Sequence, residues 1–206
     1  MEPFELVTDR VVLRVPDERD IDALVQHCSD PEVIAFTTVP VPYDRAYAAH
    51  YVTTLVPERW AGGRKLVCGV RQVGSPDRLL GIINLFDIDP DRGTAEVGYW
   101  LAAEGRGRGI MTDAVTAVLD HAFLPAPEGG LGLFRVQWTA APENVGSRRV
   151  AERVGFRFEG VLRGALVLRG RRSDALRARL IATDDRVPQR WTTPQDGVAD
   201  LTRGRA

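Results

Sequence analysis

Three short segments rich in β-forming residues, separated by turn sequences, constrain the fold of this chain most strongly. They span residues 65–73, 79–88 and 94–101, and the connections are Gly-Ser-Pro-Asp at 74–77 and Asp-Pro-Asp-Arg-Gly at 89–93. Connections of this composition join neighbouring antiparallel strands. The block therefore predicts an antiparallel meander at the centre of a sheet.

Further elements are predicted on both sides of the meander. Apolar and polar residues alternate over 8–15, which predicts a first strand. Helical spacing predicts helices over 17–30 and 44–57, each ended by a proline, while 36–43 carries two prolines and is expected to be a loop. A strongly amphipathic helix is predicted over 110–123.

The last third of the chain predicts a strand over 133–139, a helix over 144–154 and a terminal hairpin over 156–183 that turns at Gly170. The order of elements predicts one mixed α+β domain around a central sheet. Residues 1–183 are expected to form it. Residues 184–206 show little periodicity and are expected to be a partly ordered tail.

Charge narrows the classes of partner. The formal net charge is −1 and 28 acids balance 27 basic residues, which argues against a general nucleic-acid or membrane-surface protein. Residues 135–179 nevertheless carry eleven arginines and four acids. A solvated basic face and an anion-binding face both remain open for this stretch. Nucleic-acid binding through the arginines of 148–179 is disfavoured because only Phe156 and Phe158 could stack on bases in that stretch.

The N-terminus lacks the basic and apolar regions of a secretory signal, and no run of about eighteen apolar residues occurs. Cys28 and Cys68 are forty residues apart and form neither a metal motif nor a disulfide framework. Buried thiols are a better interpretation of both than an acyl-carrying nucleophile at Cys68. The expected location is the cytoplasm.

A glycine- and arginine-rich loop, 104–109, joins the third strand of the meander to the helix at 110–123. Glycines let successive N–H groups converge, and a helix N-terminus adds free donors and a positive dipole end. The loop is not a dinucleotide fingerprint, because the βαβ frame is absent, and it is not a P-loop, because no Gly-Lys-Ser/Thr follows. It suits a ligand that carries a diphosphate outside those folds.

Segments around this loop resemble the GNAT superfamily of acyl-CoA-dependent N-acyltransferases. They read AEVGYWL at 95–101, EGRGRGIMTDA at 104–114 and PENVGSRRVAERVGF at 142–156. The family's loop pattern, Gln/Arg-x-x-Gly-x-Gly/Ala, is met except that Met111 takes the last position. The nearest match is the Rim-type branch, which acetylates protein N-termini and related amines, and the similarity covers roughly 6–183.

The resemblance implies a GNAT-like sheet splayed between its fourth and fifth strands, with helices on both faces and acyl-CoA in the opening. The co-substrate would be acetyl-CoA or another short acyl-CoA, with no metal. The residues expected to bind it are Trp100, Leu101, Arg106, Gly107, Arg108, Gly109, Ile110, Met111, Asn144, Ser147 and Arg153.

Two residues are the catalytic candidates. Glu96 lies on the strand that flanks the splay and could act as the general base, directly or through water, or it could form a cross-strand ion pair with an arginine. By family analogy Ser147 lies near the sulfur as a proton donor or hydrogen-bond partner, and Asn144 orients the pantetheine or the loop after the fifth strand. Capping of the helix is the simpler explanation for both residues. The tyrosine acid of many superfamily members falls at Ala151 here, so that route is missing.

The acceptor site is expected to involve Phe36, Tyr43 and Tyr47, because the family places acceptor recognition between its first two helices. Core packing explains Tyr47 equally well. The partners expected are acyl-CoA and an amine acceptor, with no nucleic acid and no membrane. The terminal hairpin and tail are candidates for a homodimer interface.

The sequence therefore predicts an enzyme that moves an acetyl or other short acyl group from acyl-CoA to a primary amine by direct attack. The alternative is a non-catalytic acyl-CoA-binding module. Within the enzyme hypothesis the acceptor is either a protein N-terminus or a small-molecule amine, such as a polyamine or an antibiotic. Lys65 is the only lysine, so it and the α-amine are the only amines on the chain itself.

Overall fold

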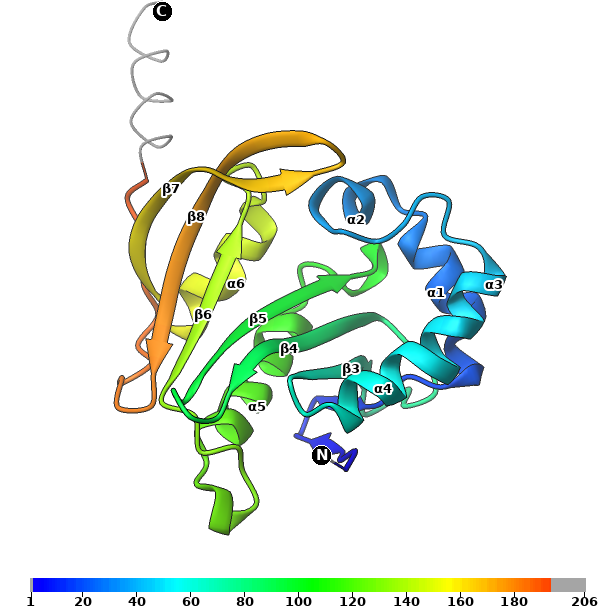
Figure 1. The fold of residues 1–206 in the computed structure, drawn as a ribbon, viewed down its shortest axis with the longest axis horizontal. Coiled ribbons are helices and arrows are strands. Elements are labelled where there is room, and N and C mark those ends of the chain that lie inside the picture. Colours follow the sequence, from blue (N-terminus) through cyan, green and yellow to red (C-terminus); the bar gives the residue numbers. More distant parts are fainter. Residues whose placement is uncertain (1, 194–206) are drawn as a thin grey trace, which may run out of the picture.

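The computed structural model describes residues 2–193, and its centre is one eight-stranded sheet (Figure 1). The strand order across the sheet is β1-β2-β3-β4-β5-β6-β8-β7. The strands are β1 (Leu6–Val7), β2 (Val11–Arg14), β3 (Lys65–Gln72), β4 (Gly81–Asp89), β5 (Thr94–Leu101), β6 (Arg135–Ala140), β7 (Arg157–Leu168) and β8 (Arg171–Ile181).

The predicted meander is present as β3, β4 and β5, each antiparallel to the next. Lys65 pairs with Phe86, and Phe86 pairs with Glu96. Directly paired residues project from the same face of a sheet. Lys65, Phe86 and Glu96 therefore form one row of side chains across three strands.

The sheet opens between β5 and β6, which are its parallel pair. Residues 94–97 pair with 135–138, and the pairing stops there. The remainder of β5, residues 98–101, pairs with β4 alone. The expected splay is thus present, and it leaves backbone groups of the second half of β5 without a neighbour strand on that side.

Helices cover both faces of the sheet. In Figure 1, α3 and α4 lie in front of the sheet, and α5 lies behind it. The α-helices are α1 (Ile21–Cys28), α2 (Pro31–Phe36), α3 (Arg45–His50), α4 (Val56–Ala61), α5 (Ile110–Phe123) and α6 (Val145–Val154). A π-helical turn spans Tyr51–Leu55, and short 3-10 turns span Glu18–Asp20, Ala103–Gly105 and Ala126–Glu128. No helix among residues 2–193 is both long and apolar enough to cross a membrane.

Two prolines behave differently from the sequence prediction. Pro31 does not only end the first helix; it begins α2, because a proline at the first helical position lacks an N–H that would be unpaired anyway. Asp30 caps this helix by accepting a hydrogen bond from the Glu32 N–H at 2.8 Å. Pro57 was expected to end its helix, but it lies in the first turn of α4, directly after the π-helical turn.

The segment after β8 packs on the domain as far as it is described. Trp191 is 7% exposed, stacks on Phe158 at 5.5 Å between ring centroids, and donates from Nε1 to the Phe156 carbonyl at 2.9 Å. Trp191 therefore attaches this part of the predicted tail to β7. Residues 194–206 are outside the described part.

Candidate functional site

Two cavities meet where the sheet splays. One, of about 260 Å³, lies between the loop after β5 and the start of α6. The other, of about 430 Å³, lies over the sheet face covered by α1, α3 and α4. Six residues line both cavities: Phe36, Thr37, Tyr99, Trp100, Asn144 and Ser147. The first is called the loop cavity below, and the second the acceptor-side cavity.

The loop cavity is bounded by a cradle of backbone N–H groups. Gly107 and Gly109 adopt φ values of 74° and 78°, a conformation that side chains with a Cβ rarely adopt. The N–H groups of 107–112 donate no hydrogen bond within the described residues, and the last three of them open the fourteen-residue helix α5. Such an arrangement binds anions, because free donors and the helix dipole point the same way.

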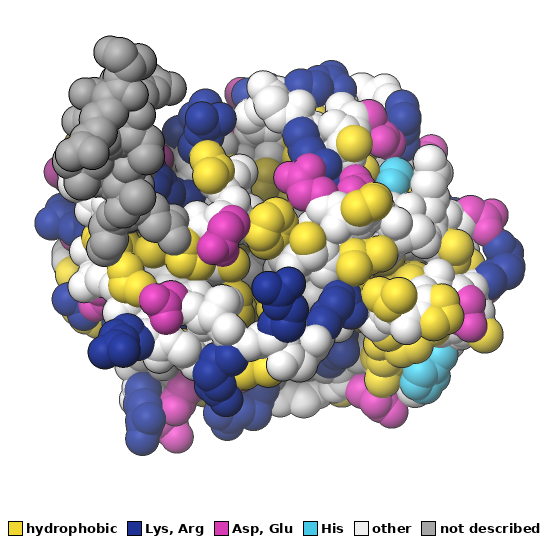
Figure 2. Space-filling view, turned by 90° about the horizontal axis from the view of Figure 1, so that it is seen from above, with side chains coloured by type: hydrophobic (Ala, Val, Ile, Leu, Met, Phe, Trp, Pro, Cys, Tyr) yellow, Lys and Arg dark blue, Asp and Glu magenta, His cyan; other side chains and the backbone are white. Residues whose placement is uncertain are grey.

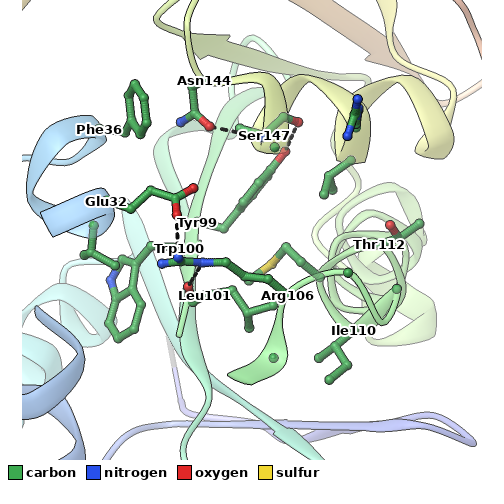
Figure 3. Close-up of a pocket in the computed structure, with 18 of the residues that line it drawn as sticks. Glu32, Phe36, Tyr99, Trp100, Leu101, Arg106, Ile110, Thr112, Asn144 and Ser147 are labelled. Carbon is green, nitrogen blue, oxygen red and sulfur yellow. Dashed lines mark hydrogen bonds and ion pairs between the residues drawn. The ribbon is translucent and has the colours of Figure 1, made fainter. Parts of the chain in front are cut away.

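The two arginines of the loop differ in their surroundings, and Arg106 lines the loop cavity. Arg106 pairs with Asp30 at 2.9 Å and with Glu32, and its Nε donates to the Leu101 carbonyl (Figure 3). Its guanidinium therefore ties the loop to α2. Arg108 does not line the loop cavity. Direct phosphate contact by either side chain stays a prediction.

Arg10 supports the loop from the first part of the chain, a contact that sequence reasoning missed. Its Nη2 donates to the Arg108 carbonyl at 2.7 Å, and its Nη1 pairs with Asp113 at 2.9 Å. Arg10 lies within the strand predicted over 8–15 and directly before β2 in the structure, and nothing in that pattern indicates a loop ninety-eight residues away.

Free positive charge comes from α6 instead. Arg149 and Arg153, one helical turn apart, both line the loop cavity and are exposed. Among the described residues neither forms an ion pair. Arg153 was predicted from the sequence, whereas Arg149 was missed although its i,i+4 spacing was a usable signal. The Thr112 hydroxyl, buried without a partner in the first turn of α5, is a further donor at this cavity.

The start of α6 lies across the pocket from the loop, with Asn144 and Ser147 on one side and Arg106 and Ile110 on the other (Figure 3). Asn144 caps the helix: its Oδ1 accepts from the Ser147 N–H at 3.1 Å. The Ser147 Oγ accepts from Trp138 Nε1 at 3.0 Å. That bond uses a lone pair of the hydroxyl, so the Ser147 proton remains free to be donated.

Tyr99 is a site residue that the sequence analysis missed. Its hydroxyl donates to the Ser147 backbone carbonyl at 3.0 Å, and its ring lines both cavities. Burial raises the pKa of Tyr99, so the hydroxyl stays protonated at neutral pH. The only sequence signal was its place two residues before the end of the strand that flanks the splay.

Glu96 lines the acceptor-side cavity and accepts a hydrogen bond from Gln137 Nε2 at 2.7 Å. Gln137 is its direct partner on β6. No arginine among the described residues forms an ion pair with Glu96, so the cross-strand partner is an amide rather than a cation. A carboxylate held by one neutral donor keeps lone pairs available for a proton.

The three residues predicted for acceptor recognition all line the acceptor-side cavity. Phe36 ends α2, and the rings of Tyr43 and Tyr47 meet edge to face at 5.1 Å between centroids. Tyr43 is buried and Tyr47 is half-buried. The core-packing explanation for Tyr47 is therefore compatible with its place on the cavity wall.

Four of the eleven arginines of 135–179 form ion pairs among the described residues: Arg135, Arg148, Arg157 and Arg179. Arg135 and Arg179 both contact Glu159, and Arg148 contacts Glu152. On the face shown in Figure 2, basic and acidic side chains are interspersed, with apolar side chains between them. In the described part of the chain no group of three or more His, Cys, Asp or Glu side chains is placed to hold a metal ion.

The fold and the anion cradle define an acetyltransferase of the GNAT type. A family model described as an acetyltransferase (GNAT) domain matches residues 10–157. The chain therefore belongs to the GNAT acetyltransferase family. The predicted fold class and the prediction of an acyl-CoA-dependent N-acyltransferase are both confirmed.

Individual relatives agree with this assignment. The uncharacterized N-acetyltransferase p20 of Bacillus licheniformis is 29% identical over 169 residues, which cover 82% of this chain and 91% of that protein. The ribosomal-protein-serine acetyltransferase of Escherichia coli (strain K12) is 38% identical over 106 residues, which cover 51% of this chain and 56% of that protein. The structure of the microcin C7 self immunity acetyltransferase MccE, in complex with acetyl-CoA and AMP, is similar in fold, with a TM-score of 0.73 at 21% identity. The matched region covers 84% of this chain and 93% of that chain.

Proposed function

We propose that this protein transfers an acetyl group from acetyl-CoA to a primary amine, by direct attack of the amine on the thioester. The observation that carries the proposal is the meeting of the two cavities at the splay. A co-substrate bound on the loop side and an amine bound on the acceptor side would come together beside Tyr99, Trp100 and Ser147, which line both cavities. Such positioning supplies much of the rate enhancement of a two-substrate reaction.

The chain offers a fitting set of groups for acetyl-CoA. The unpaired N–H groups of 107–112 suit the diphosphate, and the exposed guanidinium groups of Arg149 and Arg153 add positive charge. The edge of β5 at 98–101, free on the side of the splay, suits the amides of an extended pantetheine arm. Acetyl rather than a longer acyl group is favoured because a relative of this fold holds acetyl-CoA.

The chemistry requires a neutral amine and a protonated leaving group. Glu96 accepts the proton of the attacking amine, directly or through water, as the C–N bond forms. The Ser147 hydroxyl, whose proton is free, donates a hydrogen bond to the thiolate as the C–S bond breaks. The proton taken up by Glu96 then passes through water to the sulfur, which restores both side chains. Tyr99 holds the Ser147 backbone in place and remains protonated.

The test is release of free CoA from acetyl-CoA over a panel of primary amines that includes peptides and small molecules. Glu96→Gln preserves an acceptor for Gln137 but removes the base, so we expect kcat to fall by about 100-fold or more. Ser147→Ala is expected to lower kcat by about 10- to 100-fold. Both variants should bind CoA with the parental affinity in a thermal-shift titration.

Glu143→Gln is the matched control, because Glu143 is exposed near the site and lines neither cavity. Parental turnover by Glu96→Gln and Ser147→Ala would refute the roles given to these two side chains. CoA binding without CoA release from any amine of the panel would support the non-catalytic module instead.

A further inference from the structure

The acceptor-side cavity has two cations on its wall that the proposed chemistry does not use. Arg59, on α4, and Lys65, at the start of β3, both line it. The Arg59 guanidinium lies 5.3 Å from the centroid of the Tyr51 ring, and the Lys65 Nζ lies 5.5 Å from the centroid of the Phe86 ring. Both charges are therefore held against aromatic rings that face the same cavity.

Neither cation forms an ion pair with a carboxylate among residues 2–193. Burial, followed by the charge of Arg59, lowers the pKa of Lys65, and Asp87 opposes this effect without reaching contact. Two like charges that are close together and partly removed from water repel each other, and a bound anion reduces this repulsion.

The register of the sheet fixes where these cations lie relative to the reaction centre. Lys65, Phe86 and Glu96 are direct neighbours on three successive strands and share one face. Two strand spacings separate Lys65 from Glu96, which is about 10 Å. The Phe86 ring lies between them, and the buried Oδ1 of Asn84, on the same strand, has no hydrogen-bond partner. The cavity thus has the Glu96 carboxylate at one end and the two cations at the other. Its middle is the apolar Phe86 ring together with an amide oxygen that can accept a hydrogen bond.

We infer that the amine acceptor carries an anionic group, a carboxylate or a phosphate, which Arg59 and Lys65 bind while the amine lies at Glu96. This inference rests on the proposed function and specifies its substrate class. An extended peptide rises about 3.4 Å per residue, so an acidic side chain on the third residue reaches the cationic end from an α-amine at the centre. Polyamines and other purely cationic amines do not match this arrangement.

The test uses four tripeptide amides with a free N-terminal serine: Ser-Ala-Glu, Ser-Ala-phosphoserine, Ser-Ala-Gln and Ser-Ala-Lys. CoA release should give a kcat/KM at least about tenfold higher for an anionic peptide than for the Gln peptide, and lowest for the Lys peptide. The Glu and phosphoserine peptides distinguish a carboxylate from a phosphate. In the double variant Arg59→Gln/Lys65→Gln, the kcat/KM of the anionic peptide should come within about threefold of that of the Gln peptide. The loss should appear as a higher KM for the anionic peptide, while the KM for acetyl-CoA stays parental.

Arg64→Gln is the matched control, since Arg64 is exposed beside Lys65 and does not line the cavity. The inference is overturned if the parental protein does not prefer an anionic peptide, or if the double variant keeps the preference. A thermal melt checks folding, and the single variant Arg59→Gln, expected to show a partial loss, replaces the double variant if that one does not fold.

A binding measurement separates this inference from the proposed function. Calorimetric titration of the anionic tripeptides onto CoA-loaded protein does not depend on turnover. At least about tenfold weaker binding by Arg59→Gln/Lys65→Gln supports the anion site even if no peptide releases CoA, an outcome that would contradict the proposed function alone. Equal binding by parent and variant overturns the anion site.

Discussion

At the residue scale, the environment of a side chain decides whether its chemistry can be used. Glu96 and Ser147 line a cavity and keep unused hydrogen-bonding capacity. Cys28 also lines the acceptor-side cavity, but its side chain and that of Cys68 are buried, at 2% and 4% exposed. Burial raises the pKa of each thiol to about 12. The same residue type in a solvated site would be a nucleophile.

We therefore expect both thiols to resist alkylation by iodoacetamide in the native protein at pH 8. Only about one thiol in ten thousand would be ionised at that pH when the pKa is about 12. Both should react fully after unfolding in urea, as counted by intact mass spectrometry. Raising the pH toward 12 should increase the native rate, because deprotonation creates the reactive thiolate. Fast native alkylation at pH 8 would contradict this assignment, and an acetyl group on Cys68 after incubation with acetyl-CoA would revive the acyl-carrier interpretation.

At the element scale, we expect anion binding by the loop between β5 and α5 to depend on its backbone conformation more than on its arginine side chains. Arg106 lines the cavity with its guanidinium paired to Asp30, and Arg108 does not line it, whereas the N–H groups of 107–112 have no acceptor among the described residues. Gly107 has positive φ, and a Cβ added there would meet no atom within 4 Å. Any effect of a Cβ at this position must therefore come from the backbone itself.

Gly107→Ala is expected to weaken acetyl-CoA binding by about tenfold, equivalent to about 1.4 kcal/mol. The reason is that alanine disfavours the left-handed conformation by about 1 kcal/mol or more, which turns the N–H groups away from the diphosphate. Isothermal titration calorimetry measures the change. Gly74→Ala is the control, because its Cβ is equally free and its φ is not positive. Parental affinity in Gly107→Ala would show that the cradle does not depend on this conformation.

At the scale of the whole molecule, the β7–β8 hairpin connects the last strands of the sheet with α2. It reaches over to α2, as Figure 1 shows at the top of the view. The turn is Arg169–Gly170, both with positive φ, the conformation of a two-residue type I′ hairpin. Arg169 donates to the carbonyls of Ile34 at 3.1 Å and Val39 at 2.8 Å. Leu166 and Leu168 of this hairpin line the acceptor-side cavity.

Arg169→Ala should raise the KM for the acceptor by about three- to tenfold and leave the KM for acetyl-CoA within about twofold. The hairpin loses its attachment to α2, so the acceptor-side cavity is less well formed, while the loop cavity keeps its own supports. Steady-state kinetics with both substrates varied measures the two constants. Arg163→Ala, an exposed change on the same hairpin, is the control. Equal shifts in both KM values would contradict a role confined to the acceptor side.

The elements of the site were predictable from the sequence because their signals are local. The strand at Thr94–Leu101 and the helix at Ile110–Phe123 begin and end where the pattern of apolar residues, turns and glycines predicts. The glycine loop between them follows from the same stretch of chain. Pro31 and Pro57 were expected to end helices but lie in the first turns of α2 and α4. A proline is compatible with the end of one helix and with the first turn of the next, so the local pattern does not distinguish the two.

The sequence by itself determined the fold class, the family and the glycine loop between β5 and α5, since each is signalled by residues that are neighbours in the chain. Only the tertiary structure decided which partners the side chains have: Arg106 meets Asp30 across seventy-six positions, and Tyr99 meets Ser147 across forty-eight. It also placed Arg59 and Lys65 on the wall of the cavity that contains Glu96. Such contacts arise when strands pair and helices pack, and no local pattern specifies them.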